Sequence, residues 1–113
     1  MEMGADFPFI PERIFTIIPS KSASARGNHA HKECQQFILL ASGSCKLEII
    51  SNKDRSEYLL ETGKFGVYVP PLNWVSLSNF SLDCCILVLA SLAYDPSDYI
   101  YDLNVILENL PNL

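Results

Sequence analysis

Basic residues and histidines are scarce in this chain of 113 residues. It has 8 lysines and arginines against 13 acidic residues, which gives a formal net charge of -5, and it has only two histidines. This shortage of positive charge argues against nucleic acid as a partner, because nucleic-acid binding requires basic residues that neutralise phosphates. A local basic spot remains compatible with one phosphorylated ligand.

The chain also lacks the long apolar segments that membrane proteins need. Its apolar runs are far shorter than the roughly 20 residues with which a helix spans a bilayer. The opening segment MEMGADFPFIPERIF has no basic stretch followed by an apolar one, which a signal peptide would have. We therefore expect no membrane partner and a cytoplasmic location.

No Cys-x-x-Cys pair occurs, so the sequence gives little support to a zinc ribbon or a thioredoxin-like site. The adjacent Cys84 and Cys85 would point to opposite faces of a strand. We interpret all four cysteines as buried free thiols of a protein from a reducing compartment; they are Cys34, Cys45, Cys84 and Cys85.

What the chain does have is a series of short β-type runs separated by turn residues. Hydrophobic residues make up 49% of the chain, which is enough for a packed core. Seven or eight evenly spaced strands predict an all-β fold, either a barrel or a two-sheet jelly roll, over about residues 13–92. No repeat or linker interrupts the pattern, so we expect a single domain over residues 1–113.

The C-terminal segment differs, because its apolar residues follow a helical spacing. Asp95 is suited to an N-cap, Pro96 to the first helical position and Asp98 to an acidic first turn. We therefore predict one helix over about residues 96–110, whose apolar face is formed by Ile100, Leu103, Ile106, Leu107 and Leu110.

The only two histidines, His29 and His31, are separated by one residue in RGNHAHKECQQFILLASGSC. Residues two apart on a strand share a face, so both imidazoles would project together while Ala30 faces the other way. At the mouth of a barrel such a pair could bind a metal or move protons. The alternative is a pair on a solvent-facing strand end.

The spacing after the pair resembles the first motif of the cupin barrels. Four residues separate His31 from Gln36, and six more separate Gln36 from Gly43. The segment GKFGVYVPPLNW resembles the second motif more weakly. Metal-binding cupins usually carry Glu where Gln36 stands and a further His where Val75 stands. Two strong ligands are too few for a tight transition-metal site, so we predict no metal and no cofactor.

Two longer blocks resemble one cupin family closely, the WxcM-like nucleotide-sugar 3,4-ketoisomerases. The first is RGNHAHKECQQFILLASGSCKLEI, and the second is FGVYVPPLNWVSLSNFSLDCCILVLASLAYDPSDYIYD. The resemblance implies a small cupin barrel, and a metal-free reaction that moves a ketone between C4 and C3 of a dTDP-4-keto-6-deoxyhexose. It also implies a homodimer and a role in making deoxy- and amino-sugars for surface polysaccharides.

The chemistry of that reaction suits the histidine pair. Isomerisation requires a proton to leave C3 and another to reach C4, and an imidazole can do both near neutral pH. We therefore expect His31 to be the base and His29 its partner. Arg26 could hold a phosphate or an enediolate oxygen, or form a surface salt bridge.

Three further residues are candidates for contacts with the ligand. Gln36 could hydrogen-bond the sugar or orient a histidine. Tyr68 and Trp74 could line the barrel mouth and pack on the base or the sugar, although plain core packing is the alternative for aromatic residues.

Two departures from the family pattern keep a second function open. The family usually has a catalytic tyrosine in the strand before the histidine motif, where this chain has Phe15 and Thr16. The histidine that usually follows the tryptophan is Val75 here. A non-catalytic cupin that binds a sugar nucleotide or another small ligand is therefore the alternative to the enzyme.

Overall fold

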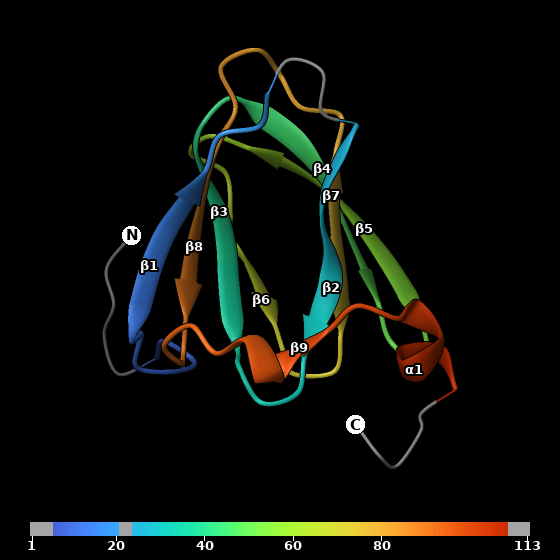
Figure 1. The fold of residues 1–113 in the computed structure, drawn as a ribbon. Coiled ribbons are helices and arrows are strands. Elements are labelled where there is room, and N and C mark those ends of the chain that lie inside the picture. The colour runs from blue at the N-terminus through green and yellow to red at the C-terminus, as the bar shows by residue number, and fades with distance from the viewer. Residues whose placement is uncertain (1–5, 21–23, 109–113) are drawn as a thin grey trace.

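The computed structural model describes residues 6–20 and 24–108, and these form two antiparallel β-sheets that face each other (Figure 1). The first sheet has the order β1-β8-β3-β6, and the second has the order β5-β4-β7-β2-β9. The strands are β1 (Arg13–Ile17), β2 (Ala25–His31), β3 (Gln36–Ser42), β4 (Ser44–Ile50), β5 (Arg55–Glu61), β6 (Val67–Val69), β7 (Trp74–Ser78), β8 (Cys85–Ala90) and β9 (Tyr99–Ile100). The predicted all-β, two-sheet architecture is confirmed. No described helix is long and apolar enough to cross a membrane.

The inner faces of both sheets form the core. Apolar side chains alternate inward along each strand, and the largest of the fully buried ones come from strands β3, β4, β5, β7 and β8: Ile38, Leu47, Leu60, Leu77 and Ile86. The four cysteines are free thiols, and three of them are buried, while Cys85 is half-buried.

The C-terminal segment corrects the sequence prediction, because the single helix over about residues 96–110 is wrong. Its first turn is a 3₁₀ helix, Pro96–Asp98, which is followed by β9 and then by the short helix α1 (Leu103–Leu107). Asp95 does cap the 3₁₀ helix, and Asp102 caps α1. Leu110 lies outside the described residues.

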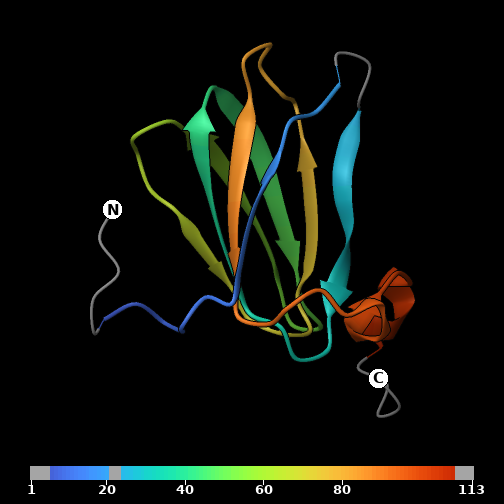
Figure 2. The ribbon, with the colours of Figure 1, turned by 60° about the vertical axis from the view of Figure 1, so that its left-hand side comes forward.

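The reason for this break is the pairing of β9 with β2, in which Ala30 lies opposite Ile100 and His31 opposite Tyr99. A short isolated helix is marginally stable in water, so tertiary hydrogen bonds and burial decide such a segment. Ile100 packs in a second apolar cluster with Ala30, Trp74 and Ile106. Helix α1, which contributes Ile106, lies beside the end of β2 (Figure 2).

The turn between β3 and β4 generates a stability prediction that has a matched control. Gly43 has a φ of +79°, and a Cβ added there would lie 2.8 Å from Cys84 Cα and 2.8 Å from Asp83 Oδ1. Gly63 has a φ of +77°, but nothing lies within 4 Å of its added Cβ. Both changes to Ala force a left-handed backbone, at about 1–2 kcal/mol. Gly43→Ala adds overpacking of about 1–3 kcal/mol.

Urea unfolding should therefore show a clearly larger loss of stability for Gly43→Ala than for Gly63→Ala. Equal losses for the two variants would mean that the packing around the β3–β4 turn is not as described.

Candidate active site

A cavity of about 410 Å³ is lined by residues of β1, β2, β3, β7 and β8 and by the segment 94–101. Its size is typical of small-molecule sites. Apolar side chains from β1, β3, β7 and β8 form its floor, and polar side chains from β2, β3 and the segment 94–101 form its rim. The cavity thus combines an apolar base with a few polar groups, as a site for a small polar molecule would.

A β-bulge in β2 brings Arg26 and His29 to this cavity together. Residues three apart on a regular strand would face opposite sides. Here Gly27 and Asn28 both have positive φ, and the register with β7 shifts between Gly27 and His29. The extra residue restores the inward direction, so Arg26 and His29 both line the cavity.

The imidazole of His29 is oriented by its own strand. Its Nδ1 lies 3.0 Å from the carbonyl oxygen of Gly27. A carbonyl only accepts hydrogen bonds, so Nδ1 carries the hydrogen and donates it. In the neutral ring Nε2 therefore keeps its lone pair and is the basic atom.

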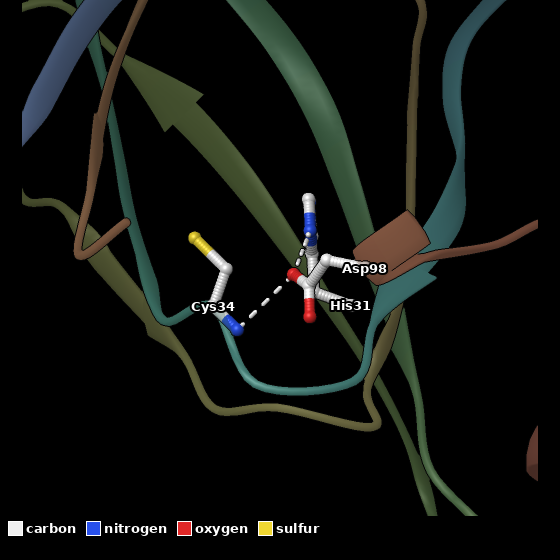
Figure 3. Close-up of side chains that lie close together, drawn as sticks. All are labelled: His31, Cys34 and Asp98. Atoms are coloured by element: carbon white, nitrogen blue, oxygen red, sulfur yellow. Dashed lines mark hydrogen bonds and ion pairs between the residues drawn. The ribbon is translucent and has the colours of Figure 1, made fainter. Parts of the chain in front are cut away.

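His31 is held by Asp98, a residue that sequence reasoning had placed in a helix. His31 Nδ1 donates to Asp98 Oδ2 at 3.0 Å (Figure 3). The same carboxylate accepts the backbone N–H groups of Glu33 at 2.8 Å and of Cys34 at 3.2 Å. His31 Nε2 is buried and has no hydrogen-bond partner among the described residues. His31 and Asp98 thus resemble the histidine and carboxylate of proton-transfer sites, in which the second ring nitrogen, here Nε2, is the base.

Both histidines are set up to be neutral at neutral pH. Burial lowers the pKa of His29 below its ordinary value of 6.5, and the charge of Arg13 lowers it further against the opposing effect of the Gly27 carbonyl. Burial also lowers the pKa of His31, although the hydrogen bond and charge of Asp98 oppose it. A neutral imidazole is the form that can accept a proton.

An aromatic group that the sequence analysis did not select completes the site. The ring of Tyr99 lies with its centroid 4.3 Å from that of His31 and 5.0 Å from that of His29, and the two imidazoles are 5.0 Å apart. Arg13 donates to the Tyr99 hydroxyl at 3.4 Å, across the barrel mouth from β1. Tyr94, Tyr99 and Tyr101 all line the cavity.

The remaining sequence candidates separate into two groups. Gln36 is buried and lines the cavity, as His29 and Arg26 do. Tyr68 lies on the outer face of β6, where its hydroxyl donates to Gln35 at 2.7 Å and its ring packs near Phe9. The structure therefore does not place Tyr68 at the barrel mouth.

Trp74 likewise belongs to the outer apolar cluster rather than to the cavity. Its neighbour Val75 is the β7 residue that faces inward and lines the cavity. Plain packing, the alternative for aromatic residues, thus describes the positions of both Trp74 and Tyr68.

One group of side chains meets the distance requirement for a metal site. The potential ligand atoms of His31, Cys34 and Asp98 lie within 4.8 Å of one another, and all three residues are buried. However, two N–H groups donate to the carboxylate oxygen that would have to bind the ion, and the Cys34 sulfur is turned away from it (Figure 3). These interactions suit a hydrogen-bonded carboxylate better than a metal ligand.

The two-sheet barrel with a histidine pair at its mouth defines a cupin-like domain. The rmlC epimerase of Mycobacterium tuberculosis has the same fold, with a TM-score of 0.68 over 79% of this chain and 50% of that one; at 15% identity this likeness shows the fold alone. The chain belongs to the family described as FdtA, WxcM-like, C-terminal, whose model matches residues 1–110.

Relatives within the family are named as sugar 3,4-ketoisomerases. The TDP-4-oxo-6-deoxy-alpha-D-glucose-3,4-oxoisomerase of Aneurinibacillus thermoaerophilus is 36% identical over 88% of this chain and 72% of its own length. The structure of WlaRA, a TDP-fucose-3,4-ketoisomerase from Campylobacter jejuni, is 34% identical, with a TM-score of 0.86 over 94% of this chain and 78% of that one.

A third relative is QdtA of Thermoanaerobacterium thermosaccharolyticum, solved in complex with TDP. It is 30% identical, with a TM-score of 0.87 over 96% of this chain and 80% of that one. The expected family is confirmed, and with it the class of enzyme, a sugar 3,4-ketoisomerase.

The hydrogen bonds at the histidines generate a titration prediction. In an NMR titration of the imidazole C–H signals, both histidines should titrate below pH 6.5, because burial disfavours the charged ring. Asp98→Asn should lower the pKa of His31 further, since it removes the charge that opposes burial. The urea-unfolded chain serves as the control, with both rings near 6.5.

The lowered pKa values of the two histidines also make the stability of the fold depend on pH. The folded chain binds fewer protons than the unfolded chain just below pH 6.5, so stability is fully present above that pH and is lost as the pH falls through the folded pKa values. A histidine that titrates above pH 6.5 in the folded protein would contradict the described burial.

Proposed function

We propose that this protein is a sugar-nucleotide 3,4-ketoisomerase that moves a ketone between C4 and C3 of a TDP-4-keto-6-deoxyhexose. The observation that carries the proposal is a pair of imidazoles 5.0 Å apart: His29 lines the cavity, and His31 behind it is held by a buried carboxylate and keeps a second nitrogen without a partner among the described residues. The relatives supply the substrate class, because they are named for TDP-sugars and one was solved with TDP.

The reaction proceeds by proton transfer at carbon. A base removes the proton from C3, which is acidic because it lies beside the C4 ketone, and an enediolate forms. A proton also passes from the C3 hydroxyl to the C4 oxygen, a proton is delivered to C4, and the ketone is now at C3. Each step needs one group that changes its protonation near neutral pH, which is the property of imidazole.

His31 acts as the base through Nε2 in this proposal, and His29 acts as its partner. Asp98 fixes the ring of His31 with Nδ1 protonated and stabilises the imidazolium that forms when Nε2 accepts the proton. His29 lines the cavity, and the lone pair on its Nε2 can accept a hydrogen bond from a sugar hydroxyl, or take up a proton and pass it to C4.

Arg26 and Gln36 bind the substrate in this proposal. Arg26 is exposed at the cavity rim and has no carboxylate partner within the described residues, so its guanidinium is available to a phosphate. Gln36 is buried beside the cavity, where its amide can hydrogen-bond a sugar hydroxyl.

A non-catalytic binding module is the second candidate. Phe15 and Val75, which stand where the family usually has a catalytic tyrosine and a histidine, both line the cavity and carry no titratable group. Relative to the usual family pattern, the cavity lacks two polar groups that could act in catalysis, while a ligand could still bind. The test must therefore separate binding from turnover.

Exchange of the C3 proton with solvent distinguishes catalytic turnover from ligand binding. The wild-type protein, treated with EDTA, should exchange the C3 proton of TDP-4-keto-6-deoxyglucose in heavy water and form the 3-keto product, since no step requires a metal. His31→Asn should lower the rate by about a hundred- to ten-thousand-fold, because asparagine cannot transfer the proton. Its affinity for TDP should remain that of the wild type. His29→Asn should lower the rate less.

Binding of TDP without any exchange by the wild type would leave the binding module as the function. Activity that disappears with EDTA and returns with a divalent metal would reject the metal-free mechanism.

We also propose that the protein is a homodimer that associates through the face of β1. This strand lies at the edge of its sheet; its side chain Ile14 is 60% exposed, and Ile18, the residue just after the strand, is 71% exposed. An edge strand that exposes β-branched apolar residues is a template for pairing with another chain. A second copy is the partner that is always present at equal concentration.

Light scattering at micromolar concentration should give about twice the chain mass of 12.6 kDa. Ile14→Glu should produce a monomer, because two charges would face each other across the interface. The control is Leu82→Glu, a 93% exposed position in the turn between β7 and β8, which should remain dimeric. A wild type that is monomeric at every concentration would reject this interface.

The cellular setting belongs to the same proposal. Sugar nucleotides of this type are intermediates for deoxy- and amino-sugars, and we propose that the protein serves the synthesis of surface polysaccharides in the cytoplasm. The support is the named activity of the relatives.

A further inference from the structure

The isomerisation needs proton transfers at oxygen as well as at carbon. C3 loses a proton and C4 gains one, while the C4 oxygen gains a proton and the C3 hydroxyl loses one. The histidine pair supplies the two transfers at carbon. A further group must exchange a proton between the two neighbouring oxygens, and it must be able both to donate and to accept.

Tyr99 has the position that such a group requires. It extends from β9 opposite His31 in the strand register, and it lines the cavity. Its ring lies within 5.0 Å of both imidazoles, measured between centroids, so a sugar carbon beside the histidines places its oxygens near the phenol. Tyr94 and Tyr101 also line the cavity, but among the described ring contacts only Tyr99 lies against both imidazoles.

Arg13 supports the phenol from the opposite sheet. Its guanidinium donates to the Tyr99 hydroxyl at 3.4 Å and also packs over the rings of Phe15 and Tyr94. The Arg13 Nε is buried and has no hydrogen-bond partner among the described residues. The hydrogen bond from Arg13 to Tyr99 holds the phenol hydroxyl in place from the opposite sheet.

We propose that Tyr99 is a catalytic residue that exchanges a proton between the C4 and C3 oxygens, with Arg13 as its positioning residue. As His31 takes the proton from C3, the Tyr99 hydroxyl donates its proton to the C4 oxygen and becomes a phenolate. As C4 receives its proton from a histidine, the C3 hydroxyl gives its proton to the phenolate. The C3 ketone forms, Tyr99 and the histidines return to their starting forms, and no oxidant or metal takes part.

This inference rests on the proposed function, and Tyr99→Phe tests it. The change removes one hydroxyl and keeps the ring that contacts both histidines. It should lower kcat by about a hundred- to ten-thousand-fold, because the oxygens lose their proton donor. The KM and the affinity for TDP should stay within about threefold of the wild type, since an interaction made only in the transition state changes kcat and not binding.

The matched control is Tyr68→Phe, which removes a phenol hydroxyl outside the cavity and should leave kcat unchanged. A second variant, Arg13→Gln, keeps the phenol and removes the charge beside it. It should lower kcat by about tenfold or more, with partial recovery in Arg13→Lys. Circular dichroism and thermal midpoints establish that each variant is folded.

The outcomes separate this inference from the function beneath it. If the wild type does not turn over, the proposed function fails. If the wild type turns over and folded Tyr99→Phe retains its kcat within about threefold, the role of Tyr99 is overturned while the isomerase stands. A raised KM with an unchanged kcat would make Tyr99 a binding residue only, which also overturns the proposal.

Discussion

The carboxylate of Asp98 is the interaction on which the site depends. It accepts the Nδ1–H of His31 and two backbone N–H groups from the turn between β2 and β3. A buried carboxylate is stable only when such donors surround it. The same three bonds fix the tautomer of His31, close the end of the barrel and hold the chain so that Tyr99 and Ile100 pair with β2.

The charge near the cavity is opposite in sign to the net charge of the whole chain. The protein carries a formal net charge of -5, yet the guanidinium of Arg26 lines the cavity and that of Arg13 lies against the lining residue Tyr99. A local positive field on an acidic protein attracts a compact anion such as a diphosphate and gives little attraction to a long nucleic acid. It also disfavours protonation of His29, which keeps that ring available as a base.

The alternation of side chains along a strand predicts the direction of Tyr68 and Trp74 better than their aromatic character does. Tyr68 is flanked by the buried Val67 and Val69, so the pleat alone directs it outward. Trp74 shares a strand face with Ser76 and Ser78, while Val75 and Leu77 face the core. By contrast, alternation by itself would place Arg26 and His29 on opposite faces of β2. The bulge at Gly27 and Asn28 brings both residues to the same face.

The strands, the inward pair of histidines and the family follow from the sequence, because they depend on local alternation and on a motif of fixed spacing. The placement of Asp98 and Tyr99 was decided by tertiary structure. The capping signal at Asp95 is local and could be predicted, but the cap at Asp102 was missed. The hydrogen bond between His31 and Asp98, which lies next to the pairing of β9 with β2, joins residues 67 positions apart in the chain. Local periodicity favoured a continuous helix there, and long-range hydrogen bonds and burial outweighed it.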